Sequence, residues 1–81
     1  MKSMNKSHRK LRSTKEIGVF VRQERKAQGI SQEQLAGVAG TGTRFVSELE
    51  HGKETIQADK MIKVVEALGY GIYVMNRWEA K

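Results

Sequence analysis

Residues 31–53 read SQEQLAGVAGTGTRFVSELEHGK, and this stretch decides the fold. It predicts two short helices, residues 31–40 and 43–50, because each starts at a residue that can cap a helix and a glycine follows its last turn. Ser31 and Gln34 also have the spacing of a capping box, in which each side chain bonds to the other's backbone N–H. Since only two residues separate the helices, they cannot continue in line and must cross.

Apolar residues at helical spacing mark the faces that the two helices turn inward. These residues are Leu35, Ala36, Val38 and Ala39 in the first helix and Val46 and Leu49 in the second. A small residue such as Ala36 lets the helices approach closely, and the larger ones fix the angle at which they cross. This is the plan of a helix-turn-helix, whose second helix enters the major groove of DNA.

Two longer helices flank this pair. They are predicted over residues 13–28 and 57–68, and a glycine follows each of them. Ser13 and Glu16 have capping-box spacing at the start of the first. We therefore expect an all-α domain over residues 13–69, a helix-turn-helix bundle of four to five helices.

The pattern changes after the last helix. Residues 70–78 hold a run of β-branched, aromatic and apolar side chains, namely Ile72, Tyr73, Val74 and Met75, followed by Trp78. Such a run favours a short strand, and a lone strand in a helical chain needs a partner for its backbone N–H and C=O groups. We expect the same strand of a second copy to pair with it, antiparallel about a two-fold axis, in a homodimer. The alternative role of these side chains is docking of another protein.

Positive charge is concentrated at the N-terminus. The chain has 81 residues and a net charge of +6, and six Lys and Arg residues without any acid fall within the first fifteen positions. Residues 1–12 are predicted to form a flexible basic arm. Such an arm either attracts DNA phosphates or is a solvated tail with no partner.

Composition narrows the class of protein. The length suits one domain, and there is no cysteine for disulfide bonds or thiolate metal ligands, which fits a cytoplasmic protein. The sequence holds no His/Cys cluster with metal-ligand spacing and no phosphate-binding glycine loop. We therefore expect neither enzymatic activity nor a cofactor, and no membrane span, since no apolar run approaches about 18 residues.

Four features of residues 31–53 carry a family resemblance: Ser-Gln at the start, the Leu-Ala pair, the turn glycine and Glu-Leu-Glu-x-Gly-Lys at the end. On these features the chain resembles the lambda-repressor-like (Xre-type) helix-turn-helix family, over about residues 16–69. Within that family it is most similar to HipB-type antitoxins, on the run 43–53, the Ala-Leu-Gly end of the last helix and the trailing strand. Members of that group repress their own operon as homodimers and bind a HipA-type Ser/Thr kinase toxin.

The resemblance and the exposed face of the second helix together indicate which residues meet DNA. The predicted contact residues are Gln32, Gly42, Thr43, Arg44, Ser47 and Lys53. Gln32 is expected to contact a phosphate beside a helix N-terminus, whereas Lys53 either contacts a phosphate or is solvated. Arg44 either reads guanine through two hydrogen bonds or binds a phosphate, and Gly42 lets the backbone come close to DNA.

Arg25 and Glu50 are expected to have a structural role. Similar repressors pair an arginine late in the first helix with the acid that ends the third helix, and the positions match here. Breaking such a pair would leave a buried charge unpaired. Phe45 has two interpretations: it packs in the core or against a partner, or it touches a thymine methyl group.

The sequence thus predicts a repressor that binds an inverted-repeat operator on double-stranded DNA as a homodimer. The narrower resemblance predicts a HipB-like antitoxin that autoregulates a toxin-antitoxin operon. A stand-alone Xre-family or prophage repressor with no toxin partner is the alternative.

Overall fold

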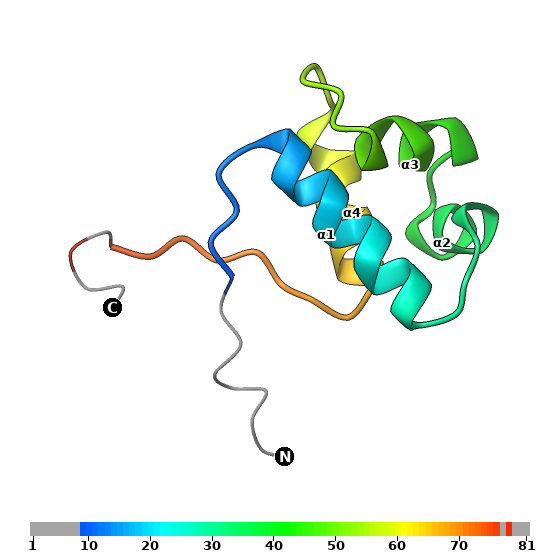
Figure 1. The fold of residues 1–81 in the computed structure, drawn as a ribbon, viewed down its shortest axis with the longest axis horizontal. Coiled ribbons are helices and arrows are strands. Elements are labelled where there is room, and N and C mark those ends of the chain that lie inside the picture. Colours follow the sequence, from blue (N-terminus) through cyan, green and yellow to red (C-terminus); the bar gives the residue numbers. More distant parts are fainter. Residues whose placement is uncertain (1–8, 77, 79–81) are drawn as a thin grey trace, which may run out of the picture.

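Four helices make up the fold in the computed structural model, which describes residues 9–76 and residue 78 (Figure 1). They are α1 (Thr14–Ala27), α2 (Gln32–Ala39), α3 (Thr43–Glu50) and α4 (Ala58–Ala67). Helix α1 packs on α3, and α2 packs on both α3 and α4. The predicted all-α helix-turn-helix bundle is confirmed, with four helices in the described part of the chain.

Side-chain caps explain where α1 and α2 begin. The Ser13 hydroxyl accepts a hydrogen bond from the Glu16 N–H at 3.1 Å, but the Glu16 carboxylate accepts from the Arg12 N–H, one residue earlier than a capping box requires. At α2 the capping box is complete: Ser31 Oγ accepts from the Gln34 N–H at 3.0 Å, and Gln34 Oε1 accepts from the Ser31 N–H at 2.8 Å. Each cap satisfies backbone donors that a helix start leaves without partners.

All four helices stop at a glycine with a positive φ angle: Gly29, Gly40, Gly52 and Gly69. The stop after α3 shows why the residue must be glycine. Gly52 has φ 79°, and a Cβ atom there would lie 3.0 Å from the Cα of Lys15 at the start of α1. The turn conformation and the close approach of α1 both disfavour a side chain at this position.

The apolar core draws on every helix. The fully buried side chains are Val21 of α1, Leu35 of α2, Val46 and Leu49 of α3, and Val64 of α4. The expectation that Val38 faces inward is wrong, since this side chain is 72% exposed. On a helix, positions 35, 36 and 39 fall within one narrow arc, and position 38 lies outside it.

Helices α1 and α3 touch through their backbones at Gly18. This residue is buried in the middle of α1. A Cβ atom added there would overlap the carbonyl oxygen of Leu49 and lie 3.1 Å from the backbone carbon and oxygen of Glu50. Only glycine therefore permits this separation of the two helices.

The segment before α1 and the segment after α4 both contact Phe20 of α1. The Arg9 guanidinium lies 5.1 Å from the centre of the Phe20 ring, and the Tyr70 ring meets it edge-on at 4.9 Å. The Tyr70 hydroxyl donates to the Glu24 carboxylate at 2.9 Å. Residues 9–12 and the C-terminal tail accordingly emerge on the same side of the bundle (Figure 1).

The predicted C-terminal strand is not formed within the single chain. Residues 70–76 belong to no helix and to no strand in the described structure, so the pairing across a homodimer stays a prediction. The arm prediction for residues 1–8 and the strand prediction at residue 77 lie outside the described residues. Among the helices that the structure describes, none combines the length and the apolar character that crossing a bilayer requires.

Candidate nucleic-acid interface

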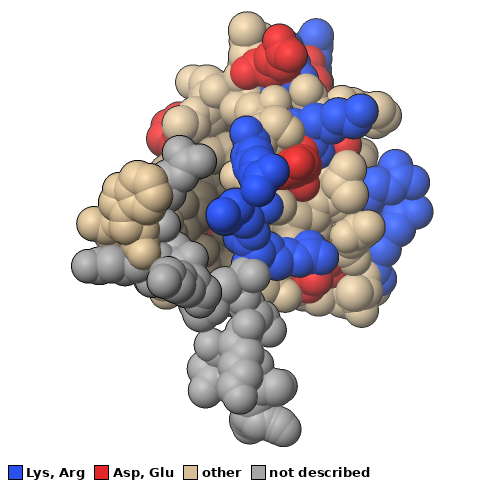
Figure 2. All heavy atoms as spheres, turned by 60° about the vertical axis from the view of Figure 1, so that its left-hand side comes forward, with Lys and Arg blue, Asp and Glu red and all other residues tan. Residues whose placement is uncertain are grey.

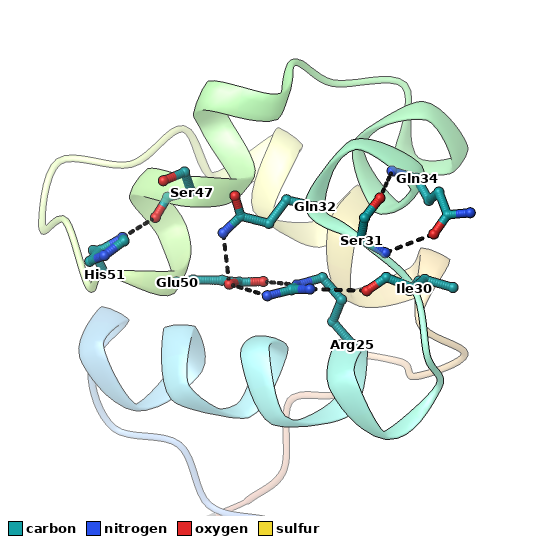
Figure 3. Close-up of polar contacts among 8 residues, drawn as sticks. All are labelled: Arg25, Ile30, Ser31, Gln32, Gln34, Ser47, Glu50 and His51. Carbon is teal, nitrogen blue, oxygen red and sulfur yellow. Dashed lines mark hydrogen bonds and ion pairs between the residues drawn. The ribbon is translucent and has the colours of Figure 1, made fainter.

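A buried ion pair ties the end of α1 to the end of α3 (Figure 3). Arg25 Nε donates to Glu50 Oε2 at 2.6 Å, and Arg25 Nη2 donates to Glu50 Oε1 at 3.0 Å. Arg25 Nη1 donates to the carbonyl oxygen of Ile30, in the loop before α2, at 2.9 Å. The structure therefore brings Arg25 and Glu50 together, in the two-bond geometry that a guanidinium and a carboxylate favour.

The surroundings keep Glu50 charged. Burial of the carboxylate raises its pKa, but hydrogen bonds from Arg25 and then Gln32 outweigh burial, so the pKa lies below its ordinary value of 4.5. The hydrogen bond to Glu50 in turn raises the pKa of Arg25. A buried pair of this kind stabilises the fold only while both partners remain ionised.

Gln32, in the first turn of α2, hydrogen-bonds to the same ion pair. Its Nε2 donates to Glu50 Oε1 at 3.0 Å (Figure 3). An amide nitrogen carries two hydrogens, so the contact with Glu50 uses one and leaves the other for a second acceptor. Helices α1, α2 and α3 are thus joined by one hydrogen-bonded network centred on Glu50.

The outward edge of α3 carries three of the predicted contact residues. Thr43 and Arg44 are exposed and Ser47 is half-buried, on the side of α3 away from the buried Val46 and Leu49. The Arg44 side chain is 90% exposed. These positions form a polar edge at the start of a short helix, which is the part of a recognition helix that reaches base edges.

Gly42 is the N-cap of α3 and has an ordinary extended conformation, with φ −87°. A Cβ atom there would meet no other atom within 4 Å. No contact within the described structure therefore requires a glycine at this position.

Glu48 also lies at this edge, between two of the predicted contact residues, although the sequence did not predict it. Its Oε2 accepts from Arg44 Nε at 3.2 Å, and its Oε1 accepts from Lys53 Nζ at 3.3 Å. The four-residue spacing from Arg44 is the signal that could have found it, since residues four apart on a helix are neighbours. Lys53 accordingly lies against Glu48 in this structure.

Phe45 and His51 complete the surroundings of the edge. Phe45 is half-buried against the core, with Lys60 Nζ 6.0 Å from the centre of its ring. His51, which ends α3, has its Nδ1 2.7 Å from the carbonyl oxygen of Ser47 (Figure 3). Among the described residues, no three His, Asp or Glu side chains lie where they could hold a metal ion together.

Comparisons with known proteins identify the family of this chain. Residues 21–74 match the family described as Helix-turn-helix. The chain is 42% identical over 73 residues to y4mF of Sinorhizobium fredii, an uncharacterized HTH-type transcriptional regulator. The aligned residues cover 90% of this chain and 96% of that relative. The chain belongs to the helix-turn-helix family of transcriptional regulators. The family assignment made from the residues is therefore confirmed.

Solved structures with this regulator's fold include two complexes of HipB. One is described as a HipA-HipB-O2-O3 complex, with a TM-score of 0.78, 17% sequence identity, and coverage of 86% of this chain and 99% of the other. The second is described as a HipB-O4 20mer complex, with a TM-score of 0.77, the same identity and the same coverage. At this level of identity the likeness establishes the shared fold.

The residues predicted to pair two copies in a homodimer lie apart from the α3 edge, on the C-terminal tail. Exposed side chains make up this set: Ile72, Tyr73, Val74, Met75 and Trp78. Val74 is fully exposed and Tyr73 is 81% exposed. Within the described chain, no backbone hydrogen bond joins residues 71–76 to the helices.

Proposed function

We propose that this helix-turn-helix regulator is a sequence-specific DNA-binding repressor that acts as a homodimer. The observation that carries the proposal is the outward edge of α3, with Thr43 and Arg44 exposed and Ser47 half-buried on a helix whose far end the Arg25–Glu50 pair fixes. Because the pair is buried and doubly hydrogen-bonded, the edge meets DNA as a rigid unit. A rigid edge loses little conformational freedom on binding, which favours selective recognition.

Each contact residue has a role in this proposal. Arg44 donates two hydrogen bonds to a guanine, while Thr43 and Ser47 contact neighbouring bases or phosphates. Gln32 donates its second amide hydrogen to a phosphate at the start of α2, where the helix dipole favours a negative charge. Gly42 leaves room for the DNA backbone, and Lys53 adds attraction to the phosphates.

The homodimer follows from the tail. Its apolar side chains are exposed and its backbone from 71 to 76 lacks hydrogen-bond partners in the described chain, as expected of a strand that pairs with a second copy. Antiparallel pairing about a two-fold axis buries these side chains and duplicates the α3 edge. Two such edges require an operator that is an inverted repeat, with half-site centres about 34 Å apart.

Selection of bound duplexes from a random pool tests this function. We expect an inverted repeat, and we expect Arg44→Ala to relax the preference at one base pair in each half-site. If Arg44→Ala weakened binding to every duplex equally, Arg44 would be a phosphate contact. A chain that stayed monomeric and bound all duplexes alike at physiological salt would refute the proposal.

A second part of the proposal is an antitoxin role, with a HipA-type Ser/Thr kinase as the protein partner. Its support is the fold shared with HipB, one of whose structures is described as a complex with HipA. Co-expression with the kinase encoded by a neighbouring gene tests it, with a stable complex and loss of kinase toxicity as the expected results. If no such kinase gene or complex exists, the chain is a stand-alone regulator.

A further inference from the structure

One carboxylate lies on the edge of α3 that the proposed function turns toward DNA. Glu48 is neither buried nor free of contacts: its side chain is 30% exposed and lies between Arg44 and Lys53. A carboxylate on such a surface repels DNA phosphates and lowers affinity for duplexes of every sequence. Its place on this edge therefore calls for a compensating role.

Stabilising the fold is not the compensating role of Glu48. The Arg44 side chain is 90% exposed, and ion pairs this exposed contribute little to folding. The buried Arg25–Glu50 pair already joins α1 to α3, whereas Glu48 connects residues of α3 with Lys53 just beyond its end.

The geometry of the hydrogen bond between Arg44 and Glu48 shows how Glu48 acts on Arg44. Glu48 accepts from Arg44 Nε, the nitrogen nearest the stem, at 3.2 Å. Within the described structure no protein acceptor bonds to the two terminal nitrogens of Arg44, so their four N–H groups are available to a ligand. A hydrogen bond at Nε restrains the direction of the guanidinium, which favours an approach that contacts the O6 and N7 atoms of a guanine together.

Lys53 keeps the Glu48 carboxylate ionised. The hydrogen bond from Lys53, helped by that from Arg44, holds the pKa of Glu48 below its ordinary value despite partial burial. Lys53 Nζ bonds to Oε1 and Arg44 Nε to Oε2, so the two cations do not compete for one oxygen. The carboxylate is therefore charged at neutral pH and held from both sides.

We propose that Glu48 is a positioning residue for base recognition: it holds the Arg44 guanidinium in the orientation that reads guanine, and its charge weakens binding to DNA of every sequence, a loss that the guanine contact offsets only on the operator. The inference rests on the proposed DNA-binding function and adds specificity to it. It predicts that loss of Glu48 tightens non-specific binding while loosening the choice of base.

The experiment compares dissociation constants for three duplexes: the selected operator, the operator with the Arg44-contacted guanine replaced in both half-sites, and an unrelated sequence. The proteins are the wild type, Glu48→Ala, Glu48→Gln and Glu66→Ala. The last removes an exposed acid from α4 and serves as the matched control for net charge. A second pair, Arg44→Ala with and without Glu48→Ala, closes a double-mutant cycle.

We expect Glu48→Ala to bind the unrelated duplex more tightly and to lose about fivefold or more of its preference for the guanine. Glu48→Gln retains part of the preference, because its amide oxygen still accepts from Arg44 Nε. Glu66→Ala keeps the full preference. In the Arg44→Ala background, the Glu48 substitution no longer changes the choice of base.

Equal changes in affinity for all three duplexes in Glu48→Ala would overturn the inference and leave the proposed function intact. A wild type that prefers no duplex would overturn the proposed function and the inference with it. The nuclear magnetic resonance signal of the Arg44 Nε–H gives a readout without DNA. Its proton should exchange slowly with water in the wild type and rapidly in Glu48→Ala, and equal exchange in the two proteins would contradict the positioning role.

Discussion

Replacing Gly18 by alanine tests the close backbone contact between α1 and α3. An alanine Cβ would overlap the carbonyl oxygen of Leu49 and lie 3.1 Å from the backbone carbon and oxygen of Glu50. These atoms belong to the backbone of α3, so no change of side-chain rotamer can relieve the overlap. Helix α1 has to move away from α3, and the core between them loses contacts.

The size of the effect follows from two opposing contributions. Over-packing of a core costs about 1–3 kcal/mol, and a clash with backbone belongs at the upper end of that range. Alanine in a helix interior is favoured over glycine by about 1 kcal/mol. We therefore expect Gly18→Ala to lower the free energy of unfolding by about 2 kcal/mol, or Tm by about 8–16 °C.

Gly37→Ala is the matched control. Gly37 is exposed within α2, and a Cβ atom there would meet no other atom within 4 Å. The same substitution should therefore stabilise the protein by about 0.5–1 kcal/mol. Thermal and urea unfolding followed by circular dichroism measure both variants, at one protein concentration because the proposed dimer would link stability to concentration. If both variants were stabilised alike, α1 and α3 would not approach as closely as described.

Four other outcomes are expected. Glu50→Gln should lower stability by about 3 kcal/mol near pH 7, because it removes one partner of a buried pair. Since the folded-state pKa of Glu50 lies below 4.5, the wild type loses this stability as the pH falls through that lower value, and thermal unfolding should show the two proteins converging in acid. Gly42→Ser should change stability by only a few tenths of a kcal/mol, since serine also caps helices, yet weaken operator binding in a titration; unchanged affinity would remove the close-approach role. Val74→Asp should shift the protein to monomer in analytical ultracentrifugation, and a dimer that persisted would exclude the tail as the interface. Deleting residues 2–12 should flatten the salt dependence of affinity without changing the preferred sequence, and an unchanged salt slope would exclude the arm from phosphate binding.

Features set by near neighbours in the sequence were predictable. The capping box of Ser31 and Gln34 and the glycine after each helix depend on residues within one turn, and the structure has them. The exposure of Val38 was not predicted, because a helix of eight residues gives too few positions to fix its inward arc.

Contacts between distant residues were harder to predict. The bond from Gln32 to Glu50 depends on how α2 and α3 cross, which spacing alone does not give. The backbone contact at Gly18 had a weak signal, a glycine inside a helical pattern, whose partner only the fold identifies. The predicted pairing of the tail involves a second chain, so the structure of a single chain does not test it.

Positive side chains form a band across the face of the molecule that lies on the left in Figure 1, as Figure 2 shows. Residues 9–12 and the tail leave the domain on that same side. The band thus lies beside the tail that is proposed to pair with a second copy.

The meeting of Arg9 and Tyr70 on the ring of Phe20 has a practical consequence for work on this protein. An affinity tag or fluorescent fusion is usually moved from one terminus to the other to avoid an interface. Here residues 9 and 70, where the two ends of the described chain leave the bundle, lie beside the same ring, so moving the fusion to the other end does not change the surface from which the chain departs. Assembly and partner capture are best measured on the untagged chain, or with a label on the exposed side of α4, for example at Lys63.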